Sequence, residues 1–237
     1  MKNAIKALGI AAAIGMGVQQ GQGAVVFSEI MYNPAGADGT NPVSEWIEIV
    51  NTGPAAVDVS GWQIDDEDGS NWAPFPAGTT LAPGQVAVII DGAFASEATF
   101  RTEWTVPAGA LVIAGAAGTL ANTASPTNEI LDLLDASSVL VDRANYEAGT
   151  AGWPASTNGR SIYALDLTPA GNDLGANWSL AQVGVDDARN PSGGTYNVAD
   201  VGSPGQAPIP EPASLSLLGL GGLTLLARRR RSASHSA

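Results

Sequence analysis

Short apolar runs, rich in β-branched residues and separated by turn residues, occupy most of the chain between residues 25 and 166. Several runs alternate apolar and polar positions with a period of two, which is typical of strands buried on one face. About eight such strands with frequent turns predict an all-β protein with a β-sandwich fold. The predicted strands cover residues 25–31, 45–51, 55–65, 85–90, 110–115, 129–135, 138–146 and 160–166.

Two local signals add detail to this pattern. The stretch "DLLDASSVLV" at residues 132–141 predicts a β-hairpin that turns at Ala136 and Ser137. The stretch "SEATFR" at residues 96–101 predicts a helical turn, with Ser96 as its N-cap. The Pro- and Gly-rich segment 203–212 is interpreted as a linker.

The N-terminus has the pattern of a signal peptide. Lys2 and Lys6 precede the apolar segment 7–18, and small residues follow it near Gly23 and Ala24. This order predicts an export signal over residues 1–23. A short amphipathic or buried helix is the alternative, but the segment is Gly-rich and has no polar face.

The C-terminus repeats the combination of an apolar run and positive charge. Residues 213–227 would form a helix of roughly 22 Å, shorter than the ~30 Å core of a bilayer. Bilayer thinning and arginine side chains that extend to the interface can accommodate a short span, so a short membrane helix is expected. A soluble core helix with a basic tail is the alternative, and glycines disfavour it. The basic cluster consists of Arg228, Arg229, Arg230 and Arg231, followed by a short tail at 232–237.

The charge between these two ends is strongly negative. Only Arg101, Arg143, Arg160 and Arg189 are basic there, against all 23 acidic residues, which gives 4 − 23 = −19. Such a charge repels phosphate groups, so nucleic acid is excluded as a partner. The chain has no cysteine, so the folded part relies on its core without disulfides.

The C-terminal pattern resembles the PEP-CTERM sorting signal of exported bacterial proteins. Pro210, Glu211 and Pro212 form the motif, and the apolar run and the arginine cluster complete it over 209–231. The resemblance implies recognition by an exosortase, which cuts near the motif. The apolar segment would then be a temporary membrane tether, and the protein would be exported to the cell surface or beyond.

The middle of the chain resembles a lamin-tail-like domain over residues 24–208. "VVFSEIMYNPAG" and "SEWIEIVNTG" with "VSGW" carry the resemblance, and "FPAGTTLAPGQVAVII" matches the next segment. "GRSIYALD", "NWSLA" and "GSPGQAP" match its closing features, apart from an insertion-like stretch at 172–196. The resemblance implies an immunoglobulin-like β-sandwich that is secreted or surface-associated and serves binding or adhesion.

Residue types limit the possible chemistry. His235, beyond the arginine cluster, is the sole histidine, so a Ser-His-Asp triad and a histidine zinc site are not open to the folded part. Carboxylates remain, and a pair drawn from Glu29, Glu45 and Glu48 could in principle hydrolyse a glycosidic bond. Because an acidic chain contains such pairs by chance, no catalytic residues are assigned and a hydrolase is kept as an alternative.

One acidic loop is a candidate calcium site. Carboxylate and amide oxygens around a Gly turn are ligands that Ca²⁺ prefers, but the spacing here does not follow the EF-hand. A solvated acidic loop is the alternative. The candidate ligands are Asp65, Asp66, Asp68 and Asn71.

Four tryptophans in loop-like sequence offer a second kind of binding site, since aromatic rings at the rim of a sandwich can stack on sugars. Their alternative role is to fold over the ends of the sandwich. These residues are Trp72, Trp104, Trp153 and Trp178.

Together these features predict a non-catalytic protein of the envelope or extracellular matrix. Its expected role is adhesion, scaffolding or ligand binding. Its expected partners are an exosortase, the membrane through the C-terminal segment, and extracellular polysaccharide. The alternatives are a structural envelope protein without a specific ligand and a carboxylate-based hydrolase.

Overall fold

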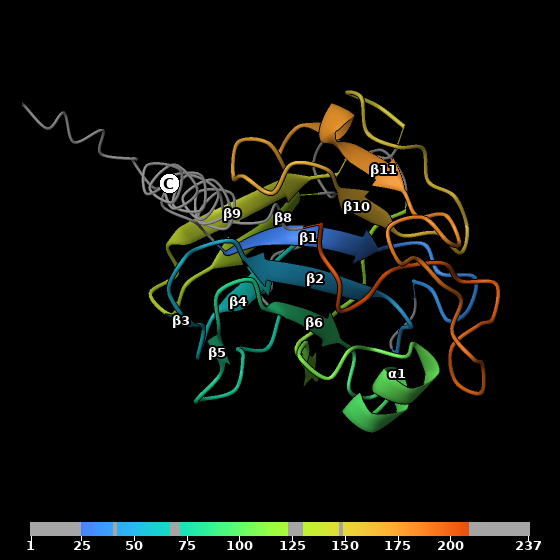
Figure 1. Cartoon of the computed structure of the whole chain (residues 1–237), viewed down its shortest axis with the longest axis horizontal. Coiled ribbons are helices and arrows are strands. Elements are labelled where there is room, and N and C mark those ends of the chain that lie inside the picture. Colours follow the sequence, from blue (N-terminus) through green and yellow to red (C-terminus); the bar gives the residue numbers. More distant parts are fainter. Residues whose placement is uncertain (1–24, 40–41, 67–71, 123–129, 147–148, 209–237) are drawn as a thin grey trace, which may run out of the picture.

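The computed structural model in Figure 1 describes residues 25–39, 42–66, 72–122, 130–146 and 149–208. A six-stranded sheet with the order β11-β10-β1-β2-β6-β7 forms one layer. A three-stranded sheet (β4-β8-β9) and a two-stranded sheet (β3-β5) complete the strands. The expected immunoglobulin-like sandwich is therefore confirmed. The strands are β1 (Val25–Met31), β2 (Trp46–Asn51), β3 (Val57–Asp58), β4 (Gln63–Asp65), β5 (Thr80–Leu81), β6 (Val86–Ile90), β7 (Leu111–Ala114), β8 (Ile130–Leu134), β9 (Leu140–Asn145), β10 (Ile162–Ala164) and β11 (Trp178–Leu180).

A helix follows β6 and allows the next strand to run parallel to it. The helix α1 (Glu97–Glu103) begins at the predicted cap, where Ser96 Oγ accepts a hydrogen bond from Thr99 N at 3.2 Å. β6 and β7 then pair in parallel, whereas the other paired strands are antiparallel. A parallel neighbour needs a crossover connection of this kind.

The predicted hairpin joins β8 to β9. Asp135 Oδ1 accepts hydrogen bonds from Ser137 N (2.8 Å) and Val139 N (2.9 Å). Ser138 has a φ of 61°, so the turn uses one residue in the left-handed region. The side chain of Asp135 thus satisfies the amides of the turn, as is common for aspartate in turns.

The central strands are more deeply buried than the alternating pattern predicts. Every residue of β1, β2 and β6 is buried, so the expectation of strands buried on one face is wrong for these three. The outer face is covered by α1 and by the C-terminal part of the chain, which crosses in front of β1 and β2 as an orange-to-red trace in Figure 1. Trp46 of β2 packs against Phe100 and Trp104 there, with ring centroids 6.2 and 5.7 Å apart.

The stretch 172–196, which looks like an insertion, is part of the sandwich. It contains a 3₁₀ helix (Gly175–Asn177) and β11, which pairs with β10. β5 and β11 were not predicted, because strands of two or three residues are too short to show a period.

The four loop tryptophans are buried, so they do not form a sugar-stacking rim. Trp72 is 8% exposed, Trp104 0%, Trp153 6% and Trp178 5%. The rings of Trp153 and Trp178 stack on each other at 5.3 Å, and Trp178 Nε1 donates to Asn172 O at 2.6 Å. Burial removes their large apolar surface from water.

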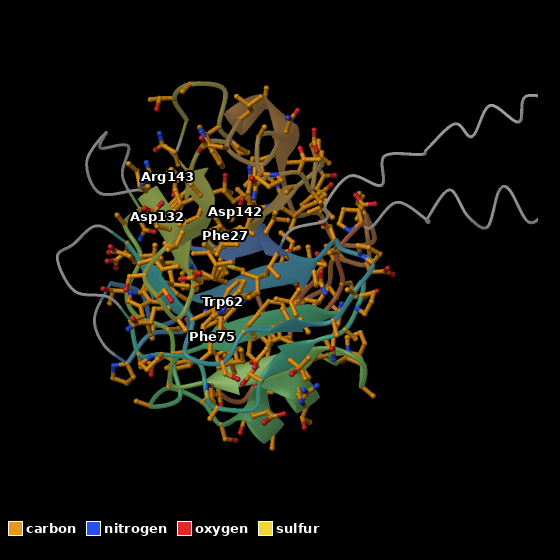
Figure 2. All side chains as sticks on the ribbon, turned by 90° about the vertical axis from the view of Figure 1, so that its left-hand side faces the viewer. Phe27, Trp62, Phe75, Asp132, Asp142 and Arg143 are labelled. Carbon is orange, nitrogen blue, oxygen red and sulfur yellow. The ribbon has the colours of Figure 1, made fainter. Side chains whose placement is uncertain are left out.

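A buried aspartate connects the two main layers. β10 pairs with β1 at Glu29 and Ile30. Phe27, nearer the start of β1, therefore has no strand partner on the β10 side. Asp142 of β9 accepts from Phe27 N at 2.8 Å, and Asn172 Nδ2 donates to the same carboxylate at 2.6 Å. Figure 2 shows Asp142 beside Phe27, next to the Asp132–Arg143 pair on β8 and β9. Side chains thus replace a neighbouring strand at this edge.

Replacing Asp142 should cost far more than replacing the nearby acid of the cross-strand pair. Asp142→Ala leaves the buried Phe27 N–H without its acceptor and leaves the Asn172 amide with Phe27 O alone, so we expect a loss of about 2–4 kcal/mol. Asp132→Ala removes a partly exposed ion pair with Arg143 and should cost about 1 kcal/mol or less. Urea unfolding of the two variants measures both values. Equal losses would contradict the role given to Asp142.

Candidate functional site

Two glutamates face each other at the centre of the main sheet. Glu29 of β1 and Glu48 of β2 are directly opposed in the register. They are 1% and 0% exposed. A register shift between Phe27 and Glu29 lies beside them, and the hydroxyl of Ser28 donates to Glu48 Oε1 at 2.7 Å. The arrangement places two acidic groups side by side in a site closed to water.

The chain's own C-terminal segment supplies the donors that close this site. Ser203 donates to Glu29 through its amide at 2.8 Å and through its hydroxyl at 2.7 Å, and Ser161 Oγ donates to the same carboxylate at 2.5 Å. Gly205 N donates to Glu48 Oε2 at 2.6 Å. We call residues 200–206 the C-terminal strap. Its contacts show that 203–206 is not the linker that its composition suggests.

Further contacts fix the strap along its length. Asp200 Oδ1 accepts from Ala35 N at 2.6 Å, and Arg189 Nη2 donates to Pro204 O at 2.8 Å. Two glycines permit the close approach. A Cβ at Gly202 would lie 2.8 Å from the Trp46 ring, and one at Gly205 would lie 2.8 Å from Val106. Gly205 also has a φ of 88°, which disfavours any other residue.

Burial is the largest influence on the pKa values of Glu29 and Glu48, and it raises both. It raises the pKa of Glu29 to about 7, although the hydrogen bonds from Ser161 and Ser203 act in the opposite direction. Burial, and then the charge of Glu29, raise the pKa of Glu48 well above its usual range. Opposed carboxyls in a dry site favour retention of a proton.

Glu45 lies apart from this pair and ties two loops together. It is 0% exposed. Its carboxyl accepts from Leu120 N at 2.6 Å and from Gly39 N at 3.4 Å. Burial and the neighbouring Asp38 raise the pKa of Glu45 to about 9.

The three glutamates therefore do not form a hydrolytic centre in the described part of the chain. Glu29 and Glu48 lie beneath the strap, and Glu45 holds loop amides elsewhere. A glycosidase needs its two carboxyls on either side of an accessible substrate bond. This geometry supports a structural role for all three.

A small cavity of about 130 Å³ lies beside the strap. Its lining includes Tyr163, Asp186, Asp187 and Gln206. The Tyr163 hydroxyl donates to Asp186 at 2.8 Å. With its amide oriented to satisfy both neighbours, Gln206 donates to Asp187 at 2.8 Å and accepts from Arg189 at 3.0 Å. The polar groups at this cavity are thus engaged with one another, and no sequence signal indicated it.

The candidate calcium ligands are described only in part. Asp65 ends β4, and Asp66 accepts from Trp72 Nε1 at 3.1 Å. Asp68 and Asn71 lie outside the described residues. Among the residues that the structure describes, no three His, Asp or Glu side chains gather in a metal-binding group. The calcium site stays a prediction.

The sorting motif Pro210–Glu211–Pro212, Arg228–Arg231, the apolar segment 213–227 and the predicted signal peptide 1–23 also lie outside the described residues. Within the described ranges, no helix has the length and apolar character needed to cross a membrane.

The described residues form an immunoglobulin-like β-sandwich, and comparison with known proteins agrees with this fold. The family model for the Lamin Tail Domain matches residues 18–148, and the model for the PEP-CTERM protein-sorting motif matches residues 208–231. The chain belongs to the Lamin Tail Domain family. The sorting motif marks it as an exported protein that an exosortase recognises. No curated protein matches the chain.

The family match ends before several residues that close the acidic site. Ser161, Ser203 and Gly205 all lie beyond residue 148. The C-terminal part of the described chain therefore completes the core that the family model covers.

The buried carboxyls should make the folded state less stable as the pH rises. In the unfolded chain such groups titrate near ~4. Burial raises the folded pKa of Glu29 and Asp142 to about 7 and that of Glu45 to about 9. The folded state then holds the extra protons. The contribution of these groups to stability is fully present below about pH 4. It is lost as the pH rises from there through each group's folded-state pKa, at up to ~1.4 kcal/mol per pH unit and group.

Thermal unfolding between pH 5 and pH 9 measures this effect, and we expect the melting temperature to fall throughout. Glu45→Gln provides the matched variant, because the amide keeps the shape of a protonated carboxyl. Its curve should be flatter than that of the unchanged chain between pH 7 and pH 9, where Glu45 alone of the three still releases its proton on unfolding. A melting temperature that is constant or rises with pH would disprove the assignment.

Proposed function

We propose that this protein is a non-catalytic adhesion or scaffold module of the cell envelope or extracellular matrix. A signal peptide exports it, and the C-terminal segment holds it at the membrane until the exosortase acts. The strongest support is the burial of Glu29, Glu45 and Glu48 in contacts that hold the fold together. The Lamin Tail Domain family is generally non-catalytic, which agrees with this role.

The negative charge of the chain between its two basic ends supports a role in cation-bridged contacts. Arg101 pairs with Glu97 at 2.8 Å, and Arg143 pairs with Asp132 at 2.5 Å. Arg160 and Arg189 donate to main-chain carbonyls. Each internal arginine is thus engaged within the chain, while the charge between the two ends is 4 − 23 = −19. Part of this formal charge belongs to buried acids such as Glu45, whose pKa burial raises to about 9. The exposed acids attract divalent cations diffusely, and these can bridge them to acidic extracellular polysaccharide.

Cell fractionation tests the export part of the proposal. The protein should be found in the envelope or the medium, and mass spectrometry should show that residues 1–23 and the arginine cluster have been removed. A variant with alanines at Pro210, Glu211 and Pro212 should remain unprocessed, while its sandwich folds as before. Intact chain, with its starting methionine, in the cytosol would contradict the proposal.

A binding assay tests the adhesion part. The purified chain is incubated with acidic polysaccharide from its own host in millimolar calcium or in EDTA. We expect at least ~10-fold tighter binding with calcium, which corresponds to ~1.4 kcal/mol. Sodium chloride at equal ionic strength is the control. Equal binding under all conditions would leave the chain as a structural envelope protein without this ligand.

A further inference from the structure

The strap and the sorting motif belong to one short stretch of chain. The strap's contacts with the buried acids run from Ser203 to Gln206, since the backbones of Gly205 and Gln206 both hydrogen-bond to Glu48. The motif begins at Pro210, four residues after Gln206, and four residues span at most ~14 Å when fully extended. Any enzyme that cuts near the motif must therefore work beside the folded sandwich.

A docked strap cannot serve as an extended substrate. Peptide recognition in an extended form uses main-chain hydrogen-bonding groups of the bound segment. The amides of Ser203 and Gly205 are engaged by Glu29 and Glu48, and the carbonyl of Pro204 accepts from Arg189. These three residues have to leave their buried site before another protein can bind their backbone.

Opening the strap would also expose the site beneath it. Glu29 would lose two donors from Ser203, and Glu48 would lose the amide of Gly205. The edge of Trp46 that packs at Gly202 would be uncovered. Removing donors from buried carboxyls is costly, so the open form is rare while the sandwich is folded.

We propose that the docked strap sets the upstream limit of C-terminal processing. While the sandwich is folded, cleavage occurs only after Gln206, and the mature protein keeps the strap as part of its fold. A chain whose sandwich has not folded exposes the strap and can be cut earlier. This inference rests on the proposed function for its role in sorting, whereas protection of the strap itself depends on the fold alone.

Limited proteolysis of the full-length chain in detergent tests the protection directly. A protease of broad specificity is added at low concentration, and mass spectrometry locates the C-terminal cuts over time. In the unchanged chain, cuts should accumulate after Gln206 and be at least ~10-fold slower within 200–206, because cleavage there follows the rare open form.

Two glycines provide a matched pair of variants. Gly205 and Gly184 have φ values of 88° and 80°, so alanine is strained at both. A Cβ at Gly205 would meet Val106, Pro107 and Ala110 within 3.2 Å, whereas one at Gly184 would meet nothing within 4 Å. Gly205→Ala should displace the strap and raise cleavage within 200–206 at least ~10-fold, and Gly184→Ala should match the unchanged chain.

A milder variant covers the case in which Gly205→Ala does not fold. Ser203→Ala removes the hydroxyl bond to Glu29 and keeps the backbone, so it should raise cleavage within 200–206 by a smaller factor. Near-ultraviolet circular dichroism of the buried tryptophans checks that each variant is folded. Equal cleavage before and after Gln206 in the unchanged, folded chain would overturn the inference.

Mature protein from the host separates this inference from the proposed function. A C-terminus after Gln206 supports both. A C-terminus anywhere before Gln206 overturns the inference and leaves export and sorting intact. A chain that is never processed contradicts the proposed function and, with it, the strap's role in sorting, even if the strap resists protease.

Discussion

The contact between the C-terminal strap and the opposed carboxyls of Glu29 and Glu48 closes the outer face of the sandwich. Like groups directly opposite on neighbouring strands disfavour pairing, and burial adds a desolvation cost. The strap amides in turn need acceptors, because Ser203 and Gly205 belong to no strand that would supply them. Each set of groups satisfies the other. Glu29 and Glu48, at the centre of the main sheet, thus depend on Ser203 and Gly205, which lie more than a hundred positions later in the chain.

Local signals in the sequence predicted the elements that local chemistry determines. Ser96 caps α1 through its own hydroxyl, and Asp135 satisfies the amides of the β8–β9 turn. Both interactions join residues that are two or three positions apart. The strong apolar runs likewise became β1, β2 and β6. The sequence therefore predicted the fold class and most strands, because these depend on neighbouring residues.

Contacts between distant residues were beyond such signals. Gly, Pro and Ser in the strap indicate turns and exposure, yet Ser203 is 3% exposed because Glu29 accepts its hydrogen bonds. The acids at positions 29 and 48 suggested a catalytic pair, since a sequence does not show what covers them. Trp178 has the context of a loop residue but packs against Trp153. Burial of polar and aromatic groups is a tertiary property, and only the fold reveals it.

The strap also fixes the position of the sandwich relative to the start of the sorting motif. Pro208 and Tyr163 of β10 line the same cavity, so the described chain ends on the outer face of the main sheet. A flexible linker would leave the orientation of the module free, but a strap fixed to within a few residues of the motif restricts it. The sheet formed by β4, β8 and β9 lies on the other side of the core, away from the strap. Its edge strand β9 and the exposed Val139 and Leu140 of the β8–β9 hairpin therefore lie on the opposite side of the sandwich from the strap (Figure 1 and Figure 2).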